Sequence, residues 1–132
     1  MNIETKHSPL PWEAEAPSLV VLDAYGNVVK RGAFVALKAL AFHFRGENKD
    51  AYDLFYLLRN YGRGVSDVAA ELRPLVADAS AVKAMEYLRG DFANSDAIGP
   101  SRAPEFLYGR PDAAIQADAA GFVRQLLAEC KK

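Results

Sequence analysis

The chain has 132 residues, of which 51% are hydrophobic and 25% charged, a composition typical of one globular domain rather than of a disordered chain. Its 16 basic and 17 acidic residues nearly cancel, which excludes a global field that would recruit nucleic acid or an anionic membrane. The single cysteine, Cys130, cannot form an internal disulfide or a cysteine-based zinc site. Because no long apolar run and no signal-peptide pattern is present, we expect a cytoplasmic protein without membrane contact.

The first 17 residues are expected to form an extended arm, because three of the seven prolines lie there, at positions 9, 11 and 17. Trp12 is the one large apolar side chain of this arm, and we expect it to pack on its own domain. Residues 18–132 are expected to form the domain proper. The pattern along it predicts a mainly α fold with one small β-hairpin, an α+β arrangement with little sheet.

The hairpin is predicted from the β-branched run Leu19–Asp23, the turn residues 24–27 and the run Val28–Arg31. Asp23, at the end of the first strand, has two interpretations. It can start the turn by accepting hydrogen bonds from nearby backbone amides, or it can be a metal ligand. The turn is favoured, because one carboxylate alone cannot hold a catalytic magnesium ion. Asp23 is therefore only a weak metal candidate.

Two helices are predicted around a short elbow. The first spans about Ala33–Phe44, with a buried face inferred from the 3, 4, 7 spacing of its apolar residues. The second spans about Asn48–Asn60, with Asn48 as a candidate cap, and its apolar circumference predicts a central place in the core. The residues expected on the buried face of the first helix are Leu37, Leu40, Ala41 and Phe44.

Three further helices are predicted towards the C-terminus. Ser66 and Ser80 are expected to cap the next two, and Pro74 should bend the end of the earlier one. Residues 93–110 contain several Gly and Pro residues and are predicted to form a loop. A last helix is expected from about residue 111 or 112 to Lys131.

Most chemistry-bearing residues suggest no site. His7 and His43 are too isolated to predict a metal site, and His43 is expected to be a packed, hydrogen-bonded residue. No Ser–His–Asp arrangement is recognisable, and Cys130 has no neighbour that predicts a lowered thiol pKa.

The elbow is different, because five charged residues gather there, and we call them the charged cluster: Lys38, Arg45, Lys49, Asp50 and Asp53. Lys38 and Arg45 are seven residues apart and therefore share one face of the first helix. Two interpretations stay open. The charged cluster can be an ion-pair network that fixes the angle between two helices, or a clamp for the phosphates of a nucleotide. Spacing alone favours the structural network.

This elbow resembles a motif of nucleotidyltransferase-like proteins, in particular the AbiEii-type toxins of type IV toxin–antitoxin systems. In that family a lysine on one helix is followed by an arginine and then by a Lys/Arg-Asp-x-x-Asp-Leu run. The matching residues here are Lys38, Arg45, Lys49, Asp50, Asp53 and Leu54. The resemblance extends from about residue 18 to the C-terminus and implies the helical half of a polymerase-β-like nucleotidyltransferase.

The chain departs from that family in one respect. The Gly-Gly or Gly-Ser turn and the Asp-x-Asp pair that binds metal in the family do not occur in this sequence. Nucleotidyl transfer needs those carboxylates to hold magnesium. The sequence therefore predicts a domain that is inactive alone, with a magnesium nucleoside triphosphate bound only if another chain supplies the carboxylates. The alternative is a non-enzymatic, antitoxin-like interaction module that self-associates as a dimer, since a truncated sheet would leave an unpaired strand edge and an uncovered helix face.

Overall fold

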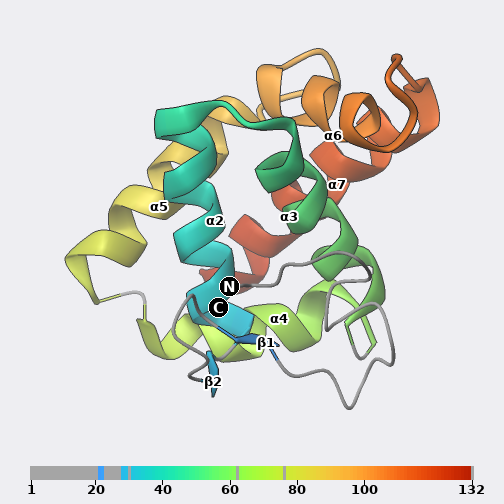
Figure 1. The fold of residues 1–132 in the computed structure, drawn as a ribbon. Coiled ribbons are helices and arrows are strands. Elements are labelled where there is room, and N and C mark those ends of the chain that lie inside the picture. The colour runs from blue at the N-terminus through green and yellow to red at the C-terminus, as the bar shows by residue number, and fades with distance from the viewer. Residues whose placement is uncertain (1–20, 23–27, 30, 62, 76, 132) are drawn as a thin grey trace.

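A computed structural model describes residues 21–22, 28–29, 31–61, 63–75 and 77–131. These residues form a mainly α fold, as the sequence predicts (Figure 1). Helix α2 lies between α5 on one side and α3 on the other, and α6 packs against both α3 and α7 (Figure 1). The described helices are α2 (Arg31–Arg45), α3 (Asn48–Asn60), α4 (Val65–Leu72), the short 3₁₀ helix η1 (Arg73–Leu75), α5 (Ala79–Asp91), α6 (Ile98–Tyr108) and α7 (Ala113–Cys130).

Two very short strands precede the helices. β1 (Val21–Leu22) and β2 (Val28–Val29) pair antiparallel, with Val21 opposite Val29 and Leu22 opposite Val28. Both fall within the stretch where the sequence predicts a hairpin. The predicted turn at 24–27 and the weak metal candidate Asp23 lie outside the described residues, as do the arm at 1–17 and its Trp12.

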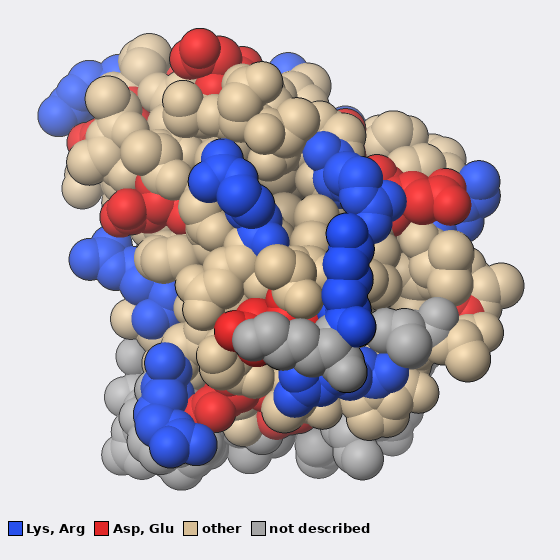
Figure 2. Space-filling model, turned by 180° about the vertical axis from the view of Figure 1, so that it is seen from behind, with Lys and Arg blue, Asp and Glu red and all other residues tan. Residues whose placement is uncertain are grey.

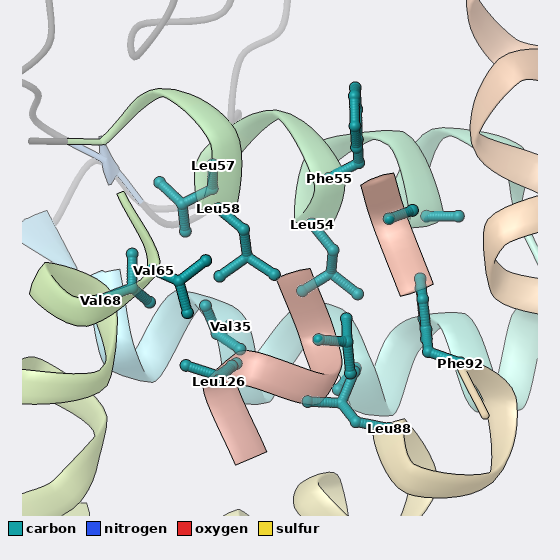
Figure 3. Packing of buried hydrophobic residues seen from close by; sticks show 14 of the residues in the cluster. Val35, Leu54, Phe55, Leu57, Leu58, Val65, Val68, Leu88, Phe92 and Leu126 are labelled. Carbon is teal, nitrogen blue, oxygen red and sulfur yellow. The ribbon is translucent and has the colours of Figure 1, made fainter. Parts of the chain in front are cut away.

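Helix α3 is the central element of the core. Its bounds agree with the prediction, and the side chains of Leu54, Leu57 and Leu58 are fully or almost fully buried. In Figure 3, Leu54 and Leu58 point from α3 towards Val35 of α2 and Leu126 of α7. Because α3 is apolar around most of its circumference, it can bury side chains against three helices at once.

The predicted buried face of α2 is wrong. Leu37 and Phe44 are 56% and 72% exposed, whereas Leu40 and Ala41 are half-buried. The buried residues of α2 are instead Phe34, Val35, Ala39 and Phe42. Both sets have helical spacing, so periodicity could not choose between them. Lys38 decides the rotation, because its ammonium group reaches inward to the carboxylates of α3.

The predicted loop at 93–110 is also wrong, because α6 occupies Ile98–Tyr108. Pro100 lies in its first turn, where a missing amide hydrogen loses no helical hydrogen bond. Gly99 is needed for packing rather than for a turn, because a Cβ atom there would lie 2.5 Å from the ring of Phe92. The helix ends at Gly109, whose φ of 70° is the left-handed conformation common at helix ends.

Three predicted helix caps are also wrong. Helix α3 is preceded by Glu47, and Asn48 is its first residue. Helix α4 starts after Gly64, while the Ser66 hydroxyl lies 3.3 Å from a carboxylate oxygen of Glu129. Helix α5 is capped by Asp78, which accepts hydrogen bonds from the amides of Ser80 and the next residue. In α5 the carboxylate of Asp78, two residues before Ser80, caps the helix in place of the Ser80 hydroxyl.

The end of the chain follows the prediction. Helix α7 begins after Asp112, which accepts a hydrogen bond from the amide of Ile115 at 2.9 Å. Its buried side includes Ile115, Val123 and Leu126. Pro74 lies in η1 directly after α4, as expected of a proline that cannot continue an α-helix. Within the described residues, no helix is long and apolar enough to cross a membrane.

Candidate functional site: a charged cluster between two helices

The elbow between α2 and α3 positions the charged cluster. Gly46 has a φ of 69°, and its amide donates to the carbonyl of Phe42 at 2.7 Å, which closes α2. A residue with a side chain is disfavoured in this left-handed conformation, so glycine suits the position. Helix α3 then starts two residues later, at Asn48, and runs back beside α2. The elbow thus brings residues 38 and 45 of one helix next to residues 50 and 53 of the other.

Both carboxylates of the charged cluster are buried. Asp50 is 2% exposed and Asp53 is 0% exposed. The ammonium nitrogen of Lys38 lies 3.0 Å from Oδ1 of Asp50 and 2.8 Å from Oδ2 of Asp53. Lys38 therefore bridges both carboxylates, and its own side chain is only 13% exposed. A buried carboxylate is costly unless a cation and hydrogen bonds compensate its lost hydration, and Lys38 supplies that for two carboxylates together.

The other two cations of the cluster approach the same carboxylates from the surface. Nη2 of Arg45 lies 2.8 Å and 3.1 Å from the two carboxylate oxygens of Asp50. Nζ of Lys49 lies 2.9 Å from Oδ2 of Asp53. Arg45 and Lys49 are 60% and 41% exposed, so both remain in contact with solvent. The structure thus brings all five residues of the charged cluster together.

The charged cluster carries more positive than negative charge, because three cations surround two carboxylates. It also has one unmet acceptor. Within the described part of the chain, Oδ1 of Asp53 is a buried oxygen without a hydrogen-bond partner. Leaving a buried acceptor unpaired costs about 1–3 kcal/mol. A network whose only task was to hold two helices together would be more stable with that acceptor paired.

Arg102 of α6 is a further elbow residue that the sequence analysis did not identify. Its Nη1 donates to the carbonyl of Gly46 at 2.8 Å and lies 3.3 Å from the side-chain oxygen of Asn48. Arg102 therefore ties α6 to the elbow. It was missed because residues 93–110 were predicted to be a loop, and a loop gives no register from which to place a side chain. A prediction of helix at residues 98–108 would have given the register needed to place the Arg102 side chain.

The remaining candidates support no second site. His43 is hydrogen-bonded, as predicted: its Nδ1 lies 3.0 Å from Oδ2 of Asp91, and its ring stacks on Tyr87 at 3.6 Å between centroids. Cys130 is buried, and desolvation raises the pKa of its thiol, which opposes a nucleophilic role. No group of three or more metal-ligating side chains lies within the described residues.

Charge is mixed on the face of the molecule that Figure 2 shows. On the face drawn in Figure 2, Lys and Arg side chains form separate groups, and Asp and Glu side chains lie among them. Among the residues that the structure describes, this face therefore shows no continuous basic surface of the kind that binds nucleic acid. The chemical capacity of the elbow is local: two exposed cations next to a buried ion pair can bind an anion such as phosphate.

No family model, no curated protein and no solved structure matches the chain.

Proposed function

We propose that this chain is the helical part of a nucleotidyltransferase-like protein, and that its charged cluster contacts the phosphates of a nucleoside triphosphate. The observation that carries the proposal is the double contact of Lys38 with Asp50 and Asp53. Because Lys38 reaches both buried carboxylates, Arg45 and Lys49 can turn towards a ligand without leaving either carboxylate unpaired. The resemblance of the elbow to the AbiEii-type motif supports the same assignment.

The two surface cations suit different parts of a triphosphate. Arg45 presents a planar guanidinium fork, which can bind two phosphate oxygens at once. Lys49 presents a compact ammonium group four residues further along the chain, on the first turn of α3. The surplus positive charge of the cluster favours an anion, while its buried carboxylates are already paired and are unsuited to binding metal.

Catalysis by this chain alone is not part of the proposal. Nucleotidyl transfer needs carboxylates that hold magnesium near the reacting phosphate, and the sequence has no Asp-x-Asp pair for this purpose. A complementing chain would supply those groups. The chain described here would contribute phosphate contacts through Arg45 and Lys49, and Lys38 would hold the two helices in register beneath them.

Calorimetric titration with magnesium ATP, GTP, CTP and UTP, and with inorganic tripolyphosphate, tests the proposal. The informative variant is Arg45→Gln/Lys49→Gln, which removes both exposed cations and keeps the Lys38 contacts. Its matched control is Arg63→Gln/Lys131→Gln, which makes the same charge change at exposed positions outside the cluster.

We expect wild type and control to bind at least one triphosphate at millimolar concentration, and the cluster variant to bind at least about tenfold more weakly. Absence of binding to every triphosphate overturns the proposal. Equal weakening in both variants also overturns it, because that result would show that binding depends only on the net charge of the chain. Binding of tripolyphosphate as well as nucleotides would show that the phosphates, rather than the base, are contacted.

A second candidate function, the non-enzymatic module that self-associates, is favoured by one different observation. Two large apolar side chains of α2, Leu37 and Phe44, are mostly exposed although they have the spacing of a buried helical face. Large apolar side chains that stay exposed on one side of a helix are a common feature of protein–protein contact surfaces. Measurement of molar mass over a wide concentration range tests this function, and a strict monomer contradicts it.

A further inference from the structure

We propose that Arg102 of α6 is a positioning residue for the charged cluster: it fixes the separation of Arg45 and Lys49, so that both cations contact one chain of phosphates. The inference rests on the proposed phosphate site and adds a residue from a third helix to it. Arg102 does not touch the ligand in this proposal. It acts through the elbow between α2 and α3, which it contacts directly.

The two exposed cations of the charged cluster are the ends of a row of alternating charges. Neighbouring members of the row lie 2.8–3.1 Å apart, in the order Arg45, Asp50, Lys38, Asp53 and Lys49. Arg45 is the last residue of α2, and Lys49 is the second residue of α3. Their separation therefore depends on how the elbow, which consists of residues 46 and 47, joins the two helices.

The elbow's own residues hold each helix end but do little to fix one end to the other. The amide of Gly46 closes α2 on Phe42, and the amide of Asp50 donates to the carbonyl of Glu47 at 3.1 Å at the start of α3. Glu47 makes no side-chain capping hydrogen bond, which is the usual way to secure a helix start. A Cβ atom at Gly46 would meet nothing within 4 Å, so packing does not confine that residue on this side.

Arg102 supplies the missing link between the two helix ends. Its Nη1 donates to the carbonyl oxygen of Gly46 at 2.8 Å and to the side-chain oxygen of Asn48 at 3.3 Å. One nitrogen thus joins the residue that follows Arg45 to the residue that precedes Lys49. Hydrogen bonds from a charged donor are stronger than neutral ones, so this link can resist a change in the elbow's geometry.

Helix α6 holds Arg102 in place against α3. Four residues beyond each partner of the Arg102–Asn48 contact, the rings of Phe106 and Tyr52 lie 5.1 Å apart between centroids. The start of α6 is fixed as well, because Gly99 packs so closely on Phe92 that a Cβ atom there would lie 2.5 Å from the ring. A side chain on a helix fixed at two places is suited to hold other side chains in a binding geometry.

Calorimetric titration of Arg102→Met with magnesium ATP, GTP, CTP and UTP tests the inference. The substitution keeps a long side chain and removes both hydrogen bonds to the elbow. The matched control is Arg124→Met, which makes the same charge change at an exposed position of α7. A second variant, Asn48→Ala, removes only the longer of the two contacts. Circular dichroism confirms that each variant is folded at the titration temperature.

We expect the dissociation constant of the bound triphosphate to rise about fivefold in Arg102→Met and about twofold to threefold in Asn48→Ala, and to stay unchanged in Arg124→Met. The decisive measurement repeats Arg102→Met in the Lys49→Gln background. Only Arg45 then remains to contact phosphate, so its separation from residue 49 no longer matters. The effect of Arg102→Met should fall below about 1.5-fold there. Phosphorus NMR of the ligand extends the measurement to this weaker binding.

Two results overturn the inference and leave the phosphate site standing. One is an unchanged dissociation constant in both Arg102→Met and Asn48→Ala. The other is equal weakening in the wild-type and Lys49→Gln backgrounds, because lost charge, lost stability or a direct contact of Arg102 with phosphate would act in both alike. If Arg102→Met does not fold, Asn48→Ala in the same two backgrounds gives the same comparison. Absence of triphosphate binding by the wild type overturns the proposed function itself, and this inference with it.

Discussion

The two sides of α2 carry similar apolar residues, but these residues are buried on one side and partly exposed on the other. The inner side buries Phe34, Val35 and Phe42, and it also buries most of Lys38. The outer side, which carries Ala33, Leu37, Leu40 and Phe44, is free of charge, yet it leaves Leu37 and Phe44 exposed. The more polar side thus faces the core. Lys38 is buried there because Asp50 and Asp53 of α3 pair with it, and hydrophobicity alone does not set the rotation of a helix.

The first test of this comparison replaces two phenylalanines that lie two residues apart. Phe42→Ala should lower the free energy of unfolding by about 4 kcal/mol, because it leaves a cavity beside Phe92 in the core. Phe44→Ala should lower it by less than about 1 kcal/mol. Urea unfolding at a concentration where the wild type is monomeric measures both. Equal losses would show that the assigned rotation of α2 is wrong.

The second test concerns the buried cation. Lys38→Met should lower the free energy of unfolding by about 3 kcal/mol, since Asp50 and Asp53 each lose a cation that pairs with them. The matched control, Lys49→Met, removes an exposed cation from Asp53 and should lower the free energy of unfolding by less than about 1 kcal/mol. Chemical denaturation of both variants at neutral pH provides the comparison. A larger loss in Lys49→Met would contradict the bridging role of Lys38.

A third test probes how closely the inner side of α2 approaches α4. A Cβ atom at Gly32 would lie 2.6 Å from the backbone carbonyl of Glu71, so Gly32→Ala should lower the free energy of unfolding by about 2 kcal/mol. Gly121 of α7 is the matched control, because a Cβ atom there meets nothing within 4 Å. Gly121→Ala should raise stability by about 0.5–1 kcal/mol through helix propensity. Thermal unfolding of the two variants should therefore shift in opposite directions.

The smallest expected effect belongs to the outer side. Leu37→Gln should change the free energy of unfolding of the monomer by no more than about 0.5 kcal/mol, because Leu37 is already mostly exposed. The same substitution should weaken any self-association through this side of α2, since Leu37 is exposed there. Stability is read from urea unfolding at low concentration, and association from sedimentation. A large loss of monomer stability would mean that this side is packed within the chain.

The accuracy of the prediction from sequence differs between elements. The bounds of α3 agree with the prediction because a dense apolar run is closed by clear stop signals at residues 61–64. Helix α6 was missed because Gly99, Pro100 and Pro104 resemble loop residues. Their place in a helix depends on Phe92, against whose ring Gly99 packs, and that contact is not visible in local sequence.

Local sequence patterns specify the mainly α fold, the elbow at Gly46 and the gathering of the charged cluster there. These features follow from local periodicity, from a glycine that ends one helix and from spacing that places charges on one face. Tertiary contacts alone set which side of α2 is buried, that Lys38 bridges two buried carboxylates and that Arg102 reaches the elbow from α6. Each of these depends on contacts between segments far apart in the chain, where the free energy of ion pairing and packing outweighs local preference.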